Sequence, residues 1–182
     1  TGDYYDNQQI INNSLMNAYV AYSPIENLKI KGTAAIRNRS TNSSTFNKLV
    51  KNFFPDGSFF YAPNNIRQRT NRNEEFFTET YFVTADYNVE IGDGKLDALV
   101  GYSQEENKLT NIRAFRDGHL TDGVQVLNAG LAGNQQADGG ETGFSVQSFF
   151  ARVGYNYKGK YLLEANIRRD GSSRFLNEKW GT

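Results

Sequence analysis

Few residues of this chain have the chemistry of an enzyme active site. The chain has one histidine, His119, which follows Asp117 and Gly118, and it has no cysteine. A lone histidine in a polar loop is more often solvated than catalytic. The sequence also lacks the G-x-S-x-G, G-x-G-x-x-G and P-loop patterns that position nucleophiles or phosphates. We therefore predict no enzyme and no bound cofactor.

One acidic stretch, Asp-Gly-Gly-Glu at 138–141, offers two carboxylates that could contact Ca²⁺. A calcium-binding loop needs more oxygen ligands at a regular spacing, and that spacing is missing here. A flexible loop tip is therefore the preferred interpretation, and no metal site is predicted.

A group of charged residues near the end of the chain is typical of a water-exposed protein surface rather than of a catalytic site. It consists of Arg152, Glu164, Arg168, Asp170 and Arg174. If the segments that carry it pair as neighbouring strands, Arg152 and Glu164 can form an ion pair. We expect the set to face a water-filled lumen. Wall salt bridges are the preferred interpretation, and contact with a plug domain or a position along a transport path are the alternatives.

Aromatic residues gather in the stretch 46–61. Helical spacing over 46–54 predicts a short amphipathic helix, formed by Phe46, Leu49, Val50, Phe53 and Phe54, with Ser43 and Ser44 as possible caps. Exposed aromatic clusters often mark binding surfaces, and the candidate loop contacts are Phe53, Phe54, Phe59, Phe60 and Tyr61. Aromatic platforms suit sugars or peptides, and these residues do not choose between the two.

Six segments alternate with period two and are predicted to be strands. Their ranges are 12–22, 28–38, 76–88, 95–106, 145–157 and 160–170. In the last of them, Leu163, Ala165 and Ile167 alternate with polar or charged residues. One face of each strand is thus apolar and the other is mostly polar, as in a sheet between lipid and water or between a dry core and water.

The connections between the predicted strands alternate in length. Those at 23–27, 89–94 and 158–160 are short, whereas those at 39–75 and 107–144 are long. Up-and-down barrels of the outer membrane have this asymmetry, with tight periplasmic turns and long extracellular loops. The chain is therefore predicted to be all-β, a section of about six antiparallel strands from a large transmembrane barrel.

Strand length and tyrosine placement agree with a membrane barrel. A tilted strand crosses the hydrocarbon layer with about 9–11 residues, and each predicted segment is long enough. Tyrosines beside the short turns are expected to form an aromatic girdle at the periplasmic interface; these are Tyr22, Tyr87, Tyr157 and Tyr161.

Charge and hydropathy narrow the possible partners. Twenty basic residues balance twenty acidic ones, so no basic surplus points to nucleic acid. No run of 18 apolar residues occurs, so no transmembrane helix is predicted. Neither a signal peptide nor a natural terminus is evident, and we expect an internal piece of a longer polypeptide.

The stretch 161–175, Tyr-Leu-Leu-Glu-Ala-Asn-Ile-Arg-Arg-Asp-Gly-Ser-Ser-Arg-Phe, followed by Lys179-Trp180-Gly181, resembles the SusC/RagA family of TonB-dependent outer-membrane transporters of Bacteroidota. The segment 149–157 resembles the family strand before that motif. The segments 96–103 and 127–130 resemble other recurrent family segments, whereas 1–79 agrees in strand and loop pattern only.

This resemblance implies that residues 1–182 are part of the receptor's β-barrel domain in the cell outer membrane. It implies a 22-stranded barrel, a plug and a TonB box in parts of the protein outside this chain, and a SusD-like lipoprotein over the external loops. The implied activity is TonB-dependent import of glycans or oligopeptides. Two alternatives stay open at this point, namely a passive porin-like barrel and a soluble β-sandwich carbohydrate-binding module.

Overall fold

The computed structural model describes residues 4–61, 66–175 and 180–181, so Lys179 of the family motif lies outside the described residues. The strands are β1 (Tyr5–Ile25), β2 (Leu28–Asn47), β3 (Lys51–Phe53), β4 (Phe59–Tyr61), β5 (Gln68–Ile91), β6 (Gly94–Asp117), β7 (Gln136–Tyr157), β8 (Tyr161–Ser172) and β9 (Trp180–Gly181). Two short 3₁₀ helices, η1 (Leu127–Ala129) and η2 (Ala132–Asn134), lie between β6 and β7.

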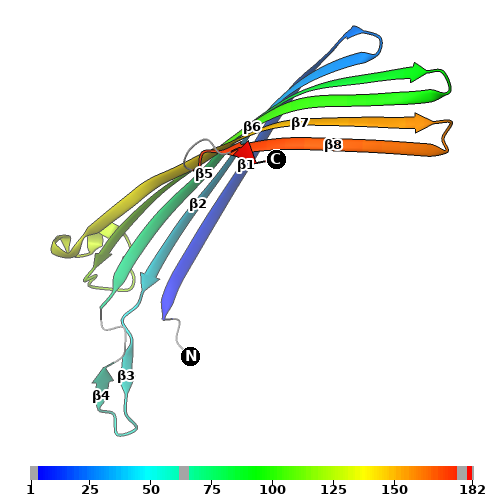
Figure 1. Ribbon diagram of the computed structural model, residues 1–182. Helices are drawn as coiled ribbons and strands as arrows, with labels where there is room; N and C mark the ends of the chain where they lie inside the picture. Colours follow the sequence, from blue (N-terminus) through cyan, green and yellow to red (C-terminus); the bar gives the residue numbers. More distant parts are fainter. Residues whose placement is uncertain (1–3, 62–65, 176–179, 182) are drawn as a thin grey trace. The chain divides into compact units, whose positions relative to one another are not determined.

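The strands form one large sheet and one small hairpin. The large sheet has the order β1-β2-β5-β6-β7-β8-β9, and β3 pairs with β4 in the small one. The six long strands therefore follow one another in chain order, and tight turns join β1 to β2, β5 to β6 and β7 to β8 (Figure 1). This arrangement confirms the predicted all-β, up-and-down fold. A β-sandwich needs two sheets packed face to face, so the sandwich alternative is wrong.

The predicted strands are within three residues of the observed ones at their turn ends and too short at their loop ends. We expected the loop that follows β2 to begin at residue 39, but β2 continues to Asn47, and β6 continues to Asp117 instead of 106. The stretch 138–141, expected to be a loop tip, lies in β7. Hydropathy alternation marks a strand only where one face is apolar, so these polar extensions carry no such signal.

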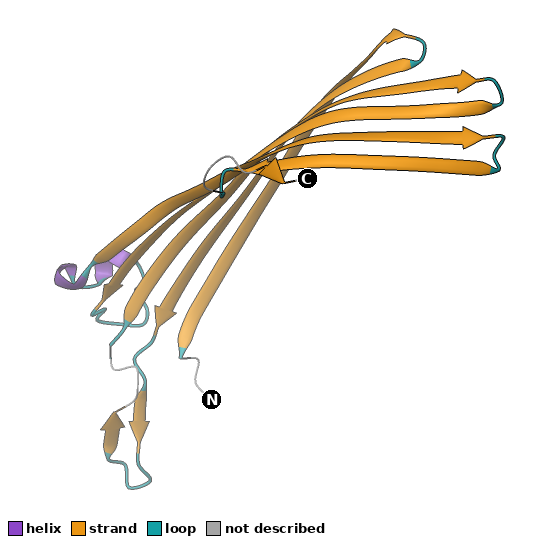
Figure 2. Ribbon diagram, viewed as in Figure 1, coloured by secondary structure: helices purple, strands orange, loops and turns teal. Residues whose placement is uncertain are grey.

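The chain divides into two compact units that share the long strands. Unit 1 comprises residues 1–13, 39–76 and 109–142, and it contains the long loops. Unit 2 comprises residues 14–38, 77–108 and 143–182, and it contains the tight turns (Figure 2 shows strands and loops).

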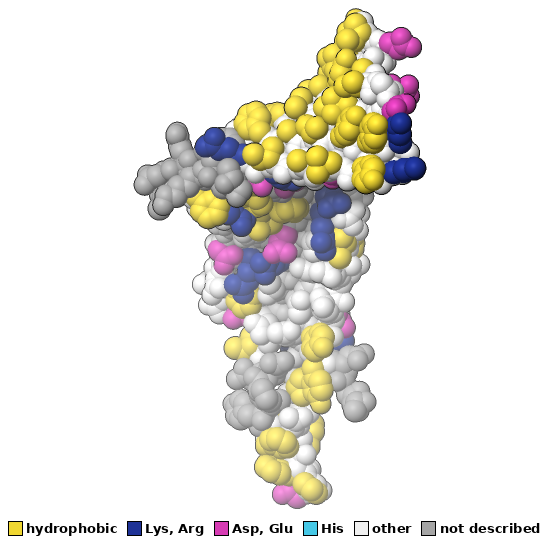
Figure 3. Space-filling model, turned by 45° about the vertical axis from the view of Figure 1, so that its right-hand side comes forward, with side chains coloured by type: hydrophobic (Ala, Val, Ile, Leu, Met, Phe, Trp, Pro, Cys, Tyr) yellow, Lys and Arg dark blue, Asp and Glu magenta, His cyan; other side chains and the backbone are white. Residues whose placement is uncertain are grey.

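Unit 2 carries an exposed apolar row on one face. In the β7–β8 pair, Tyr155 lies opposite Leu163, Val153 opposite Ala165, and Ala151 opposite Ile167. Val153, Leu163 and Ile167 of this row are solvent-exposed, at 48%, 73% and 67%. Figure 3 shows hydrophobic side chains gathered over this unit, with charged side chains along their margin. Such a row is the expected surface for lipid contact.

Neighbouring turns of unit 2 are held in register by hydrogen bonds. The amide N of Asn88 donates to the carbonyl oxygen of Asn27 at 2.9 Å, and the amide N of Lys158 donates to that of Asp93 at 3.0 Å. The Nζ of Lys158 also lies 2.8 Å from the carboxylate of Asp93. These contacts tie three hairpins together at their turn ends.

Unit 1 contains the one hydrophobic side chain that is fully buried among the described residues, Phe46. It lies in β2, as do Ser43 and Ser44, whereas Phe53 lies in β3. The predicted amphipathic helix over 46–54 is therefore wrong. Across the part of the chain that the structure describes, no helix is long and apolar enough to cross a membrane.

Candidate functional site

The predicted lumen-facing residues lie in unit 2, and Arg152, Glu164, Arg168 and Asp170 are on the row opposite the apolar one. In the register of β7 and β8, Arg152 lies opposite Asn166, and Glu164 lies opposite Gly154. Arg152 and Glu164 are therefore diagonal neighbours rather than directly opposed, and Asn166 donates to the Glu164 carboxylate at 2.8 Å.

Arg168 is the centre of a polar network on the same row. Its Nε donates to the Asp170 carboxylate at 2.7 Å, and its NH2 group donates to the hydroxyl of buried Ser148 at 3.1 Å. Arg174 follows β8, and its guanidinium stacks over the ring of Phe144 at 3.7 Å from the ring centroid. The Arg-Arg-Asp-Gly-Ser-Ser-Arg motif thus connects β8 to β7 through side chains.

The predicted aromatic contacts lie in the β3–β4 hairpin of unit 1. Phe53 and Phe59 pack edge to face at 5.9 Å, and Phe54 and Phe60 pack at 4.6 Å between ring centroids. All four remain exposed by 37–59%, and the backbone of Tyr61 pairs with Lys51. The hairpin therefore presents aromatic surface that the rest of the described chain does not cover.

The tip of this hairpin is held by Asp56. Its carboxylate accepts hydrogen bonds from the hydroxyl and the amide of Ser58, at 2.6 and 2.8 Å. These bonds stabilise the ionised form and hold the pKa of the Asp56 carboxyl below its ordinary value. Gly57 adopts a φ of 82° in the same turn, which favours glycine.

His119 has a packing role in the β6–β7 loop, residues 118–135, and the expectation of a solvated histidine is wrong. Its ring is 4% exposed and packs edge to face on Phe46 with 5.2 Å between centroids. Its Nε2 lies 3.0 Å from the carbonyl oxygen of Val126. Among the described residues, no group of three or more His, Cys, Asp or Glu side chains could hold a metal ion.

Polar contacts tie the β6–β7 loop to other parts of unit 1. Gln125 donates to the carboxylate of Asp6, which also lies 2.7 Å from the Nζ of Lys48. These two partners, Lys48 first, hold the pKa of the Asp6 carboxyl below its ordinary value. Arg67 forms a second ion pair, with Asp122. The loop is thus an ordered cover rather than a loose connection.

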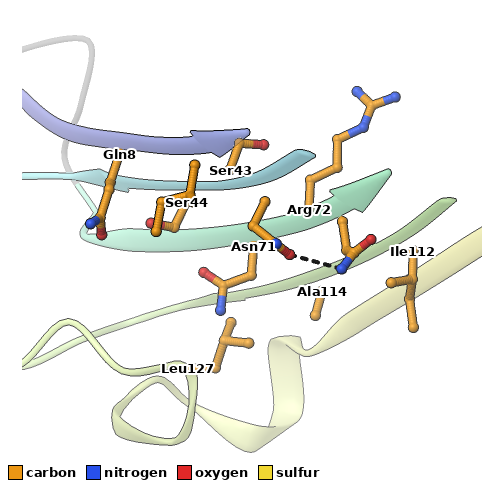
Figure 4. A pocket seen from close by; sticks show the side chains of 11 residues that line it. Gln8, Ser43, Ser44, Asn71, Arg72, Ile112, Ala114 and Leu127 are labelled. Atoms are coloured by element: carbon orange, nitrogen blue, oxygen red, sulfur yellow. Dashed lines mark hydrogen bonds between the residues drawn. The ribbon is translucent and has the colours of Figure 1, made fainter. Parts of the chain in front are cut away.

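A pocket of about 350 Å³ lies in unit 1, next to this loop. It is lined by Gln8 and Ile10 of β1, Asn42, Ser43 and Ser44 of β2, Asn71, Arg72 and Asn73 of β5, Ile112 and Ala114 of β6, and Leu127 of the loop. Figure 4 shows Gln8, Ser44 and Asn71 directed toward the side where Leu127 lies, and Arg72 directed away from it. The sequence analysis missed this site, because four strands and a loop contribute to it and none has a local motif.

The fold, the exposed apolar row and the alternation of tight turns with long loops define a section of an outer-membrane β-barrel. No family model matches the chain. Among curated proteins, it is 30% identical over 181 residues to TonB-dependent receptor P39 of Formosa agariphila, which is 97% of this chain and 16% of the relative. It is 29% identical to TonB-dependent receptor P26 of the same organism, over 94% of this chain and 17% of the relative.

Solved structures agree with these relatives. The RagAB peptide transporter matches with a TM-score of 0.83 and 22% identity, over 97% of this chain and 20% of the matched chain. The RagAB peptide importer in its open-open state matches with a TM-score of 0.82 and 23% identity, over 97% of this chain and 19% of the matched chain.

The chain is a barrel section of the TonB-dependent receptors, and the RagAB match agrees with the SusC/RagA resemblance. It spans about a sixth of the length of the curated relatives. The predicted outer-membrane location is confirmed, because TonB-dependent receptors are outer-membrane proteins. The relatives and structures are receptors and transporters by name, in agreement with the expectation that the chain is not an enzyme.

Proposed function

We propose that this chain forms wall and loops of a receptor that imports glycans or oligopeptides across the outer membrane with energy delivered through TonB. The observation that carries the proposal is the exposed apolar row of unit 2 on a sheet whose relatives are TonB-dependent receptors. The barrel domain contains residues 1–182, and a plug and a TonB box in other parts of the protein provide gating and coupling.

The polar row of unit 2 is proposed to line the conduit. Glu164 accepts a hydrogen bond from Asn166, and Arg168 contacts Asp170 and Ser148. Charged groups that are paired in this way stay compatible with a hydrated lumen and do not need to be desolvated. In this role Arg152, Arg168 and Arg174 set the charge of the wall and contact the substrate or the plug.

The aromatic hairpin is proposed to bind a SusD-like lipoprotein. Its support is the exposure of Phe53, Phe54 and Phe59, since aromatic residues are enriched at the centres of protein interfaces. Replacing both Phe53 and Phe59 by serine in the full receptor is expected to weaken recovery of the lipoprotein about tenfold. Leu120→Ser is the control, because Leu120 is exposed on the other loop. Equal recovery in both variants would reject the hairpin as a contact.

Growth experiments test the import itself. A strain without the receptor is compared with a strain without TonB, on each candidate glycan or oligopeptide as the only nutrient. Both strains are expected to lose growth on the same substrate. Uptake that depends on the receptor and continues without TonB would favour the passive porin-like alternative instead.

A further inference from the structure

We propose that a row of unpaired cations on β2 selects an acidic oligosaccharide, one whose rings carry carboxylate or sulfate groups. The row consists of Lys29, Lys31 and Arg37, which lie in unit 2 and alternate with apolar or small residues of β2. The inference rests on the proposed function, in which the polar face of unit 2 lines the conduit. It goes further than that function because it assigns the charge of the substrate.

Contacts with β1 place these cations on the polar face. The Nζ of Lys31 lies 4.8 Å from the ring centroid of Tyr19. A Cβ added to Gly32, the next residue, would lie 3.7 Å from Val20, an apolar side chain that is 71% exposed. Successive side chains of a strand point to opposite faces, so Tyr19 and Lys31 share the face opposite Val20. The other two cations are an even number of residues from Lys31 and lie on the same face.

The cations of β2 are not paired with other side chains. Lys29 and Arg37 are exposed, and neither makes an ion pair or a hydrogen bond with another described residue. The neighbouring strand β1 contributes residues 14–25 to unit 2, and none of them is charged. Arg168 of β8, in contrast, donates to the Asp170 carboxylate at 2.7 Å. The charges of β2 are therefore available to a ligand.

The strand on the other side of β2 supplies one nearby carboxylate. The amide N of Asn88 donates to the carbonyl oxygen of Asn27, and two residues further along each strand this register puts Asp86 opposite Lys29. The Asp86 carboxylate accepts a hydrogen bond from the Thr84 hydroxyl at 3.5 Å and forms no ion pair with Lys29. Three cations therefore face one carboxylate, and this part of the face has a surplus of positive charge.

The length of the row suits a chain rather than a small anion. Side chains two residues apart on a strand are separated by about 7 Å, so Lys29 and Lys31 form a close pair, and Arg37 lies about 20 Å further along. A single small anion reaches only one end of such a row. A chain with several anionic groups contacts both ends, and each further contact adds affinity without a second loss of translational freedom.

Tyr19 favours an acidic sugar over an acidic peptide. Tyr19 is 72% exposed, and its ring lies beside the ammonium group of Lys31. An acidic sugar ring holds C–H groups and an anionic group on one rigid unit, so it can contact the tyrosine ring and the ammonium group together. The carboxylate of an acidic peptide is on a flexible side chain that must be ordered on binding. Asn17 and Thr33 share this face by alternation, and their amide and hydroxyl groups match sugar hydroxyls.

The test uses the full-length receptor in detergent, titrated calorimetrically with hexasaccharides of galacturonate, alginate and chondroitin sulfate. Maltohexaose is the neutral probe, and hexaglutamate is the acidic peptide probe. At least one acidic hexasaccharide is expected to bind more tightly than maltohexaose, and high salt is expected to weaken this binding because it screens exposed charges.

Replacing both Lys29 and Lys31 by glutamine is expected to weaken the binding of the acidic hexasaccharide about tenfold. Two controls should bind it as the parent receptor does. Lys31→Arg keeps the charge, and Lys160→Gln removes an exposed lysine from a tight turn outside the row. Thermal unfolding of each variant separates loss of the site from loss of the fold.

The proposal is overturned if no acidic hexasaccharide binds, if maltohexaose binds equally well, or if the double glutamine variant binds as the parent does. Hexaglutamate binding with the same dependence on the two lysines would also overturn it, because the row would then select acidic peptides. The growth experiment reports TonB-dependent import whatever the charge of the substrate, so the failure of one proposal can be distinguished from the failure of the other.

Discussion

Unit 1 and unit 2 are built from the same long strands, but they differ in which hydrophobic side chains they bury and expose. Unit 2 exposes Leu163 and Ile167 and buries no large hydrophobic side chain among its described residues. Unit 1 buries Phe46 beneath the β6–β7 loop. Where lipid is the solvent, a sheet needs no second layer. In unit 1, the β6–β7 loop supplies the layer that covers Phe46.

The largest expected effect comes from removing the one buried phenylalanine of unit 1. Phe46→Ala leaves a cavity under His119 and is expected to cost about 3–5 kcal/mol of local stability. The β6–β7 loop should then exchange its amide hydrogens much faster, whereas unit 2 should not change. Phe53→Ala is the control, since Phe53 is 59% exposed. Unchanged exchange in the loop of the Phe46 variant would show that the loop is ordered by other contacts.

A charge introduced on the apolar row tests whether this row of unit 2 faces lipid. Ala165→Arg in the full receptor is expected to destabilise the barrel by about 2–4 kcal/mol, because the charge meets hydrocarbon. Asn166→Arg is the matched control on the opposite row of β8. Urea unfolding in lipid vesicles measures both. Equal costs for the two variants would mean that neither row faces lipid.

A smaller effect is expected at the start of the β6–β7 loop. Gly118 has a φ of 72°, and an added Cβ would lie 2.6 Å from Leu131. Gly118→Ala is expected to cost about 1–2 kcal/mol, from the backbone conformation alone. Gly133→Ala, where nothing lies within 4 Å, is expected to be neutral. Loop protection measured by hydrogen exchange compares the two, and the strained-turn interpretation fails if Gly133→Ala has the larger effect.

The smallest expected effect is a pH dependence of amide hydrogen exchange in the same loop. The folded pKa of Asp6 is lowered by Lys48 and Gln125, so its contribution is present above the unfolded pKa and is lost as pH falls through the folded pKa. Loop exchange, corrected for its intrinsic pH dependence, should therefore speed up below about pH 4. Asp6→Asn should remove this extra acceleration. An acid response that persists in Asp6→Asn would assign it to another carboxyl.

The sequence predicted unit 2 well because its signal is local. The alternation of Leu163, Ala165 and Ile167 with polar residues identifies both the strand and its faces. The turn ends were also predicted to within three residues, since Gly92-Asp93 and Lys158-Gly159-Lys160 mark tight turns.

Unit 1 could not be predicted in the same way. The loop-side ends of β2 and β6 are rich in polar residues and show little alternation of hydropathy, so both strands were expected to end too early. The spacing of Phe46 and Phe53 is also typical of one face of a helix. In the fold, however, the ring of Phe46 packs on the ring of His119, which lies in a distant segment of the chain. The pocket is formed where Gln8, Ser44 and Asn71 come together from three strands. No local sequence pattern predicts which residues of different strands lie close together.

The hydrogen bonds between neighbouring turns have a consequence for how such a receptor can diversify. Asn27 with Asn88, and Asp93 with Lys158, fix the pairing of three hairpins at one end. The connection at the other end can then grow or shrink without shifting that pairing, and doubling its length costs only about 0.6 kcal/mol in closure entropy. New binding surfaces can therefore evolve by insertion into the long loops, while the pairing of the strands stays the same.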